Sequence, residues 1–223
     1  MYETGFPVKY KITSEYIDTI AIARSDTAPA RTLGPIEEIE VSQQSTPQNF
    51  GATILGNFRN TTDYSLKLIN FNNLPIGNIY TFSFVYNRAL QFESLLNLNL
   101  SKVGGGNYKI GTMSNMVALK NVTVKPNTLG QLDLIDQSKN WWNISSAPLL
   151  TDSSLISIAN GLCSTYTSKI QLHSTPKTRC SVITGTVSQV TDDTGTYDFF
   201  TEDANGTVTL ADFITTIKGW TLA

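Results

Sequence analysis

The sequence predicts a β-rich α+β fold in which short repeats stack on one another, preceded by an N-terminal region that is extended or a small β unit. From about residue 64, short apolar alternations are separated by Asn and Gly, and similar apolar pairs recur about two dozen residues apart. The 223 residues suffice for one large domain or two small ones. We expect an arm or docking region at 1–60 and a repeat domain with a C-terminal cap at 61–223.

The repeat is clearest at residues 119–129, LKNVTVKPNTL, which match the leucine-rich-repeat template L-x-x-L-x-L-x-x-N-x-L. Residues 95–103 match it up to the Asn position, and an equal step back from Leu95 reaches residues 71–76. Two such steps forward from Val122 lead to Ile170, whereas the intermediate step meets Ser146 and breaks the pattern. Stacked coils share one core because a single coil cannot bury its apolar face. A β-sandwich of irregular strands remains the alternative.

A helix is predicted over Thr151–Leu162. Thr151 or Asp152 can accept hydrogen bonds from its free N–H groups, and Asn160-Gly161 offers a left-handed stop. A strand over Lys169–Ser174 and a second helix over Pro176–Thr184, opened by Thr175-Pro176, should follow. Helix, strand and helix at this spacing indicate a repeat array with helices on its outer side.

The tail predicts a hairpin, a short helix and a terminal edge strand. Strands are expected at Asp198–Thr201 and Thr207–Leu210 around a turn at Asn205-Gly206, followed by a helix near Ala211–Lys218. Trp220 and Leu222 would form a last strand that covers the open end of the stack, as repeat arrays require.

The composition argues against most enzymes. Lys and Arg number 16 against 18 Asp and Glu, so no basic excess supports nucleic-acid binding. One histidine and two cysteines cannot build a His/Cys metal cluster, and no G-x-S-x-G elbow accompanies His173. No apolar run is long enough to span a bilayer, and no secretory signal is visible. We therefore expect no cofactor, no metal, no nucleic acid and no membrane span.

Four aromatic residues and the histidine are candidates for contact with a ligand. Trp141 and Trp142, with Tyr166 and also Tyr197, have the flat apolar rings of a sugar-binding platform, with core or subunit packing as the alternative. His173 should face opposite to Leu172, outward from its strand, as a surface histidine without a catalytic partner.

The cysteines and acidic pairs have plain structural interpretations. Cys163 and Cys180 are expected to be free thiols, although stacked coils could bring them together as a disulfide. Asp203-Ala204-Asn205-Gly206 with Asp212 has part of a calcium loop, but a plain hairpin turn fits better because the Gly comes too early and no Glu follows. Asp192-Asp193 is expected to be a solvated loop.

The residues from Leu149 to Leu162, then Ile170 to Thr175, and the ending Lys218 to Ala223 resemble a recurring leucine-rich-repeat terminus. This arrangement is similar to the C-terminal domain of many bacteriophage tail and virion proteins and of related bacterial surface repeat proteins. The resemblance covers about residues 90–223 and implies a non-enzymatic structural or adhesive domain. The sequence departs from the pattern by inserting Ser181 to Gly206, so the last coil is expected to be altered.

In this interpretation the chain is a virion protein of a bacteriophage tail, fibre or capsid-decorating type, assembled in the host cytoplasm. Residues 1–60 would bind other virion proteins, and the repeat domain would contact a host surface glycan or protein. We expect a homo-oligomer, in which many weak sites act together. A bacterial cell-surface leucine-rich-repeat adhesin is the second hypothesis. A glycan-acting enzyme is the third, and no motif suggests it.

Overall fold

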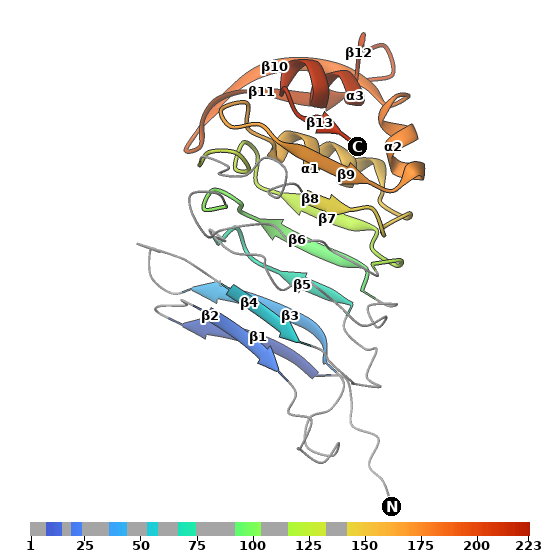
Figure 1. Cartoon of the computed structure of the whole chain (residues 1–223). Helices are drawn as coiled ribbons and strands as arrows, with labels where there is room; N and C mark the ends of the chain where they lie inside the picture. Colours follow the sequence, from blue (N-terminus) through green and yellow to red (C-terminus); the bar gives the residue numbers. More distant parts are fainter. Residues whose placement is uncertain are drawn as a thin grey trace, which may run out of the picture.

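The computed structural model of the chain (Figure 1) describes residues 8–14, 19–23, 36–43, 53–57, 67–74, 92–103, 116–132 and 142–223. The described residues form a mixed α+β fold with more strand than helix, as the sequence predicts. Most neighbouring strands run parallel, and the antiparallel pairs lie near the C-terminus.

The described part of residues 1–60 consists of paired strands. β1 (Val8–Ser14) pairs in parallel with β3 (Ile36–Gln43), and β2 (Thr19–Ala23) pairs in parallel with β4 (Thr53–Asn57). β3 also pairs with β5 (Leu68–Asn70), so one sheet continues across residue 60.

That sheet has five parallel strands in the order β1-β3-β5-β6-β7, where β6 is Ser94–Leu98 and β7 is Asn121–Val124. Ile69 of β5 pairs with Leu95 of β6, and Leu95 pairs with Val122 of β7. All three side chains are buried, and they form a column through the sheet. Successive side chains of a strand point to opposite faces of the sheet, so one face is buried and the other carries mainly polar residues.

The register corrects the predicted repeat spacing. Ile69 pairs with Leu95 and Leu95 pairs with Val122, so each step along the chain is longer than the predicted step from Leu95 to Leu119. Leu119, on which the template is aligned, is buried but lies in a turn closed by its N–H bond to the Met116 carbonyl. Apolar residues recur three positions apart in this motif. An alignment of the repeats that is shifted by three residues therefore fits the sequence nearly as well as the predicted one.

Helix α1 (Asp152–Gly161) confirms the first predicted helix, with Thr151 as its N-cap. The helix covers the edge of β7 where a further strand would otherwise pair. The Ser154 hydroxyl donates to the Lys120 carbonyl (2.8 Å) and accepts from the Val122 N–H (2.9 Å). The Ser157 hydroxyl accepts from the Val124 N–H (2.9 Å). The hydroxyl groups of these two serines thereby form hydrogen bonds with backbone groups at the edge of β7 that a further strand would otherwise have bound.

The predicted left-handed stop at Asn160-Gly161 is wrong. Gly161 stays within α1, and Leu162 is the C-cap. The glycine serves a close approach instead: a Cβ at this position would lie 2.5 Å from Cγ1 of Val124. The helix can lie against β7 only because residue 161 has no side chain.

A second parallel sheet has the order β13-β9-β8, where β8 is Trp142–Ile144, β9 is Lys169–Leu172 and β13 is Thr221–Leu222. Trp142 pairs with Ile170, so the slot that seemed broken at Ser146 does contain a strand, which lies just before that serine. β13 confirms the predicted terminal edge strand, since Thr221 pairs with Lys169 of β9.

Helix α2 (Ser174–Cys180) begins and ends earlier than predicted, because His173, not Thr175, is its N-cap. The predicted insertion forms the hairpin of β10 (Thr184–Asp192) and β11 (Gly195–Glu202), and β12 (Val208–Thr209) pairs with the start of β10. The short α3 (Leu210–Asp212) and the π-helix η1 (Phe213–Ile217) replace the predicted helix near Ala211–Lys218.

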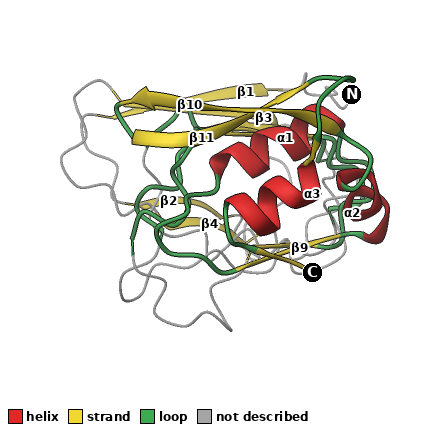
Figure 2. Cartoon of the chain, turned by 90° about the horizontal axis from the view of Figure 1, so that it is seen from above, coloured by secondary structure: helices red, strands yellow, loops and turns green. Residues whose placement is uncertain are grey.

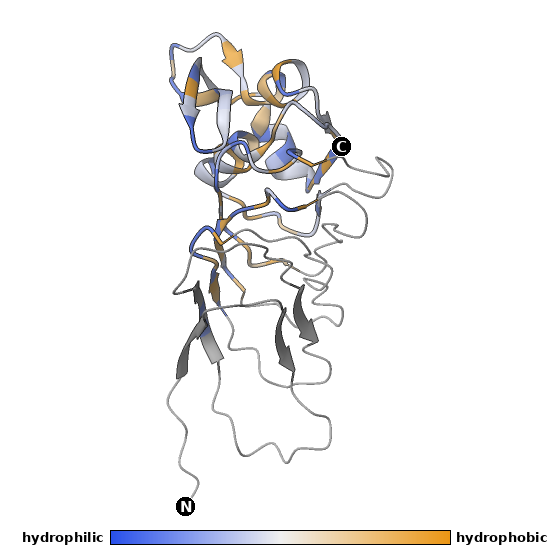
Figure 3. Cartoon of the chain, turned by 90° about the vertical axis from the view of Figure 1, so that its left-hand side faces the viewer, coloured by the Kyte–Doolittle hydropathy of each residue, from blue (hydrophilic) through white to orange (hydrophobic). Residues whose placement is uncertain are grey.

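The view along the stack shows α1 and α3 between two walls of strands (Figure 2). The β10–β11 hairpin lies on the side of β1 and β3, and β9 lies on the opposite side (Figure 2). One cluster of buried apolar residues runs from Ile69 in β5 to Trp220 before β13. Hydrophobic and hydrophilic residues are mixed along the coloured segments around it (Figure 3). Among the described helices, none has the length and apolar character needed to cross a membrane.

Candidate functional site

The outward side of β5, β6 and β7 carries amide and hydroxyl groups, and we call it the polar face. Its polar members are Asn70, Asn72, Ser94, Asn97, Asn121 and Thr123, and the half-buried Leu68 and Leu96 lie on the same side of the sheet. The Asn97 amide Nδ2 donates to Asn70 Oδ1 across the β5–β6 boundary (2.8 Å). The Asn121 amide donates to the Ser94 hydroxyl across the β6–β7 boundary (3.1 Å). Side chains of adjacent strands thus hold each other in fixed positions.

Charged side chains at the margins of the polar face have polar partners. Lys120 and Glu93 form an ion pair at 3.6 Å, with both side chains about half exposed. The Asn72 amide donates to the Glu40 carboxylate at 3.1 Å. A surface of fixed amides and hydroxyls with little net charge offers donors and acceptors to a neutral polar ligand such as a glycan.

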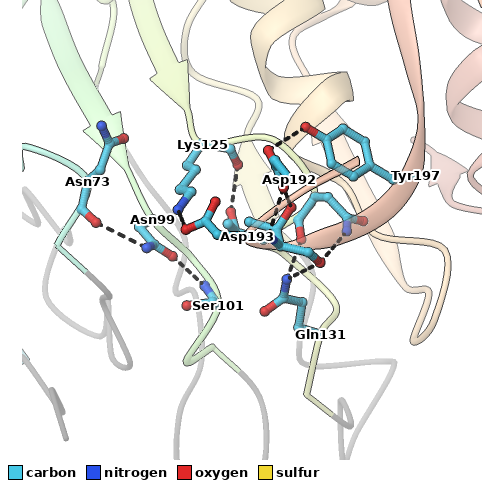
Figure 4. A network of polar contacts seen from close by, with 11 residues as sticks. Asn73, Asn99, Ser101, Lys125, Gln131, Asp192, Asp193 and Tyr197 are labelled. Atoms are coloured by element: carbon cyan, nitrogen blue, oxygen red, sulfur yellow. Dashed lines mark hydrogen bonds and ion pairs between the residues drawn. The ribbon is translucent and has the colours of Figure 1, made fainter. Parts of the chain in front are cut away.

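Asparagine also holds the turns between strands. Asn72, Asn73, Asn97 and Asn127 have positive φ angles, a conformation that Asn adopts more readily than other residues with a side chain. The buried Asn99 amide donates to the Asn73 carbonyl (3.0 Å), and its Oδ1 accepts from the Ser101 N–H (3.1 Å) (Figure 4). Asn72, Asn73 and Asn127 lie in turns and Asn97 lies within β6, so the backbone conformation accounts for asparagine at these four positions.

The tip of the β10–β11 hairpin binds the turn that follows β7 (Figure 4). Lys125 Nζ lies 2.6 Å from Asp193 Oδ2, with 23% and 74% of the two side chains exposed. The Asn127 amide donates to the Thr194 carbonyl at 3.0 Å, and the Gln131 amide donates to the same carbonyl at 3.3 Å. Asp192-Asp193 is therefore more than the solvated loop expected from sequence, because its turn joins the hairpin to the parallel sheet.

Asp192 and Tyr197 set the electrostatics of this tip. Asp192 Oδ1 accepts from the Thr194 hydroxyl and N–H, and its Oδ2 accepts from the Tyr197 hydroxyl at 2.8 Å. The Thr194 hydrogen bond, with smaller effects of Tyr197 and Lys125, lowers the pKa of Asp192. Burial, and then the hydrogen bond to Asp192, raises the pKa of Tyr197 to about 12. Asp192, Thr194 and Tyr197 thus form a structural contact within the hairpin tip.

The structure separates the predicted aromatic platform. Trp142 is only 1% exposed and belongs to the core, so its ring is not available to a ligand, and Tyr197 is buried as well. Tyr166 is 41% exposed, and Trp141 lies outside the described residues. Trp142 alternates with Asn143 along β8, and its inward direction follows from the pairing with the buried Ile170.

His173 has a structural contact that sequence did not predict. It is half-buried, and its Nδ1 accepts from the Thr175 N–H at 3.2 Å, which caps α2. The predicted strand over Lys169–Ser174 is too long, because β9 ends at Leu172 and His173 lies between β9 and α2.

The interpretation of the cysteines is confirmed, whereas the hairpin predicted around Asn205-Gly206 is wrong. β10 lies between β11 and β12, so the turn at Asp203 connects two strands that do not pair with each other. Cys163 and Cys180 are both buried free thiols, and burial raises the pKa of Cys180 to about 11. Asp203 closes a turn, with its carbonyl accepting from Gly206 N–H and its carboxylate from Asn205 N–H. Thr209 caps α3 by accepting from the Asp212 N–H, and the Asp212 carboxylate accepts in turn from the Thr209 hydroxyl.

A buried lysine escaped the sequence analysis. Lys218 is 1% exposed, and its Nζ lies 5.5 Å from the Tyr197 ring centroid and 5.2 Å from that of Phe213. Burial lowers its pKa, and the charge of Asp198 partly opposes that effect. Lys218 directly precedes Gly219, where sequence indicated only the end of a helix.

No family model matches the chain, and no curated protein or solved structure gives a significant match to it. Among the described residues, no three His, Cys, Asp or Glu side chains gather in a way that could hold a metal ion.

Proposed function

We propose that the chain is a bacteriophage virion structural protein of the tail, fibre or capsid-decorating type, built as a leucine-rich-repeat-like solenoid. The observation that carries the proposal is the parallel pairing of consecutive strands β5, β6 and β7, with Ile69, Leu95 and Val122 in one buried column. A β-sandwich would pair its strands mainly antiparallel. The steps from Ile69 to Leu95 and from Leu95 to Val122 both fall within the length range of known leucine-rich repeats.

The segments that resemble virion repeat domains support the same proposal. They form the helix α1, the strand β9, the helix α2 and the closing strand β13. The Trp220 indole N–H donates to the buried Cys163 carbonyl at 2.7 Å, which fixes the end of the chain against the rest of the fold. This closure suits the terminal cover that a repeat array needs.

The polar face is the proposed binding surface for a host glycan or protein. Each contact with fixed amides and hydroxyls is weak, and many copies on one particle multiply the effect. Asn121 and Thr123 are both exposed on β7 and point outward from a strand whose other side is buried. Binding then depends on shape and repetition and needs no catalytic group.

Residues 1–60 are the proposed attachment to other virion proteins. Imaging of particles that carry the chain without residues 1–60 tests this attachment. Loss of the protein from the particle is expected, and normal incorporation would contradict the docking role.

Binding to host cells tests the polar face. The variant Asn121→Arg places a long side chain on this face without disturbing the buried side of β7, and it should abolish binding of particles or clustered protein. Asn205→Arg, in the exposed turn before β12, is the matched control and should bind as the parent does. Equal binding by both variants would remove the polar face as the contact surface.

Locating the protein separates the proposal from its alternatives. The virion proposal expects it in purified particles. Its presence on the surface of uninfected bacteria would support the adhesin hypothesis, and release of sugars from host wall polysaccharide would support a glycan-acting enzyme.

A further inference from the structure

The outer edge of β10 is an unpaired strand edge at the end of the molecule away from β1 and β2 (Figure 1). β10 spans Thr184–Asp192 and pairs with β11 along its inner edge from Gly185 to Asp192. On its outer edge β12 pairs with Thr184 and Gly185 alone. Among the described strands, none pairs with that edge over residues 186–192.

The direction of the backbone groups along β10 follows from two hydrogen bonds. The Thr184 carbonyl accepts from the Asp203 N–H (3.0 Å) and so points toward β11. The Ile183 carbonyl accepts from the Leu210 N–H (2.9 Å) and so points to the β12 side. The direction alternates along an antiparallel strand. Three residues therefore direct their N–H and C=O groups to the unpaired edge, namely Val187, Gln189 and Thr191.

A contact on the opposite edge of the hairpin supports this assignment. Phe200 pairs with Val187, so its own backbone groups must point away from β10. The Asn160 amide does meet them there, on the outer edge of β11. The outer edge of β11 is thus attached to α1, whereas the outer edge of β10 lacks a comparable partner among the described residues.

The free edge lacks the features by which proteins prevent strand addition. Residues 186–191 read TVSQVT, without a charge or a proline, and four of the six are exposed. Charged side chains, prolines and bulges normally protect such edges. The stretch is also rich in β-branched Thr and Val, which favour extended pairing.

The edge is also self-complementary. Its free stretch, residues 186–192, is centred on Gln189. A two-fold axis at Gln189 would pair Val187 with Thr191 of a second copy and Thr186 with Asp192, so no like charges would face each other. The outward groups of the three residues would form about six hydrogen bonds between the copies.

We propose that two copies of this chain associate by antiparallel pairing of their β10 edges about a two-fold axis at Gln189. The two hairpins then form one continuous sheet, and β1 and β2 of each copy lie at the far ends of the pair. One strand pair buries less than the roughly 1,200 Å² of a stable interface. Association is therefore weak in dilute solution and becomes strong where copies are held close together.

Sedimentation of the full chain at increasing concentration tests the proposal, and the parent protein should shift from monomer to dimer. Gln189→Pro removes the central N–H donor without touching the β10–β11 ladder, because this N–H points away from β11. It should weaken association about tenfold or more. Gln189→Thr keeps the donor and is the matched control, which should dimerise as the parent does.

A second variant and a second measurement guard against a local disturbance of the hairpin. Gln189→Lys keeps the backbone and places two ammonium groups at the axis, so it should weaken the dimer most at low salt. Hydrogen exchange at the amides of Val187, Gln189 and Thr191 should slow as concentration rises, while that of Ser188 and Val190 stays constant. A parent protein that remains monomeric, or a dimer that survives both Gln189→Pro and Gln189→Lys, would overturn the proposal.

Discussion

The side-chain amide of Asn160 pairs with both backbone polar groups of Phe200. Asn160 Oδ1 accepts from the Phe200 N–H at 2.8 Å, and Asn160 Nδ2 donates to the Phe200 carbonyl at 2.9 Å. Both residues are buried, and they join helix α1 to the edge of β11. One side chain thus reproduces the two hydrogen bonds of a strand pair, and it connects the β10–β11 hairpin to helix α1.

Asn160→Ala should destabilise the fold by about 2–4 kcal/mol. The substitution leaves the N–H and C=O groups of Phe200 buried without partners, and each such group costs roughly 1–3 kcal/mol. Urea unfolding followed by circular dichroism measures the loss. Asn205→Ala, in an exposed turn, is the control and should stay within about 0.5 kcal/mol of the parent. An Asn160→Ala protein as stable as the control would show that the hairpin is not held through this amide.

Gly161→Ala should be destabilising because the new Cβ meets Val124 at 2.5 Å. Overpacking of this kind costs about 1–3 kcal/mol, although alanine is the better helix former. The test is a double-mutant cycle with Val124→Ala, which removes the atoms that clash. The double variant should be more stable than the sum of the two single effects predicts, and strict additivity would contradict the close contact.

Sequence reasoning found the elements with strong local signals. Thr151 and the apolar face behind it predicted α1, and Trp220 and Leu222 predicted the last strand. It failed where tertiary contacts decide the outcome. Gly161 could not be distinguished from a helix stop, because only its distance to Val124 reveals its role. The strand at Trp142 was missed because the expected repeat length was too short.

The polar face and the hairpin contacts were less accessible to sequence. The repeat template at residues 119–129 was fitted through its apolar positions, and nothing local showed which strands lie beside Asn121 and Thr123. Asp193 contacts Lys125 across 68 residues of sequence. The burial of Asn160 and Lys218 was not predicted, since a buried polar residue is identified by its surroundings and not by its spacing.

The Lys125–Asp193 ion pair should contribute little to stability despite its 2.6 Å separation. Asp193 is largely exposed, and exposed pairs contribute about 0.2–1 kcal/mol. A double-mutant cycle with Lys125→Met and Asp193→Asn should give a coupling energy in that range, which falls as salt rises. A coupling well above it, or one unaffected by salt, would mean that the hairpin tip is held mainly by this charge pair. We expect the main contact of the hairpin tip to be the hydrogen bond from the amide of the buried Asn127 to the Thr194 carbonyl.

Replacing Lys218 by methionine should leave the fold as stable as the parent or more stable. The ammonium is buried against the rings of Tyr197 and Phe213, and apolar replacements of buried charged groups are neutral or stabilising by about 1–4 kcal/mol.

The native pKa of Lys218 lies below its ordinary value of 10.5, so the unfolded chain binds more protons between the two values. The parent's free energy of unfolding should therefore receive a rising contribution from Lys218 as pH increases through this window, and that contribution should level off near 10.5. Urea titrations at several alkaline pH values should show this contribution as the difference between parent and Lys218→Met, while the exposed Lys177→Met control should retain it. A Lys218→Met protein that is much less stable than the parent at neutral pH would show that the contacts of the ammonium with the two rings outweigh its burial.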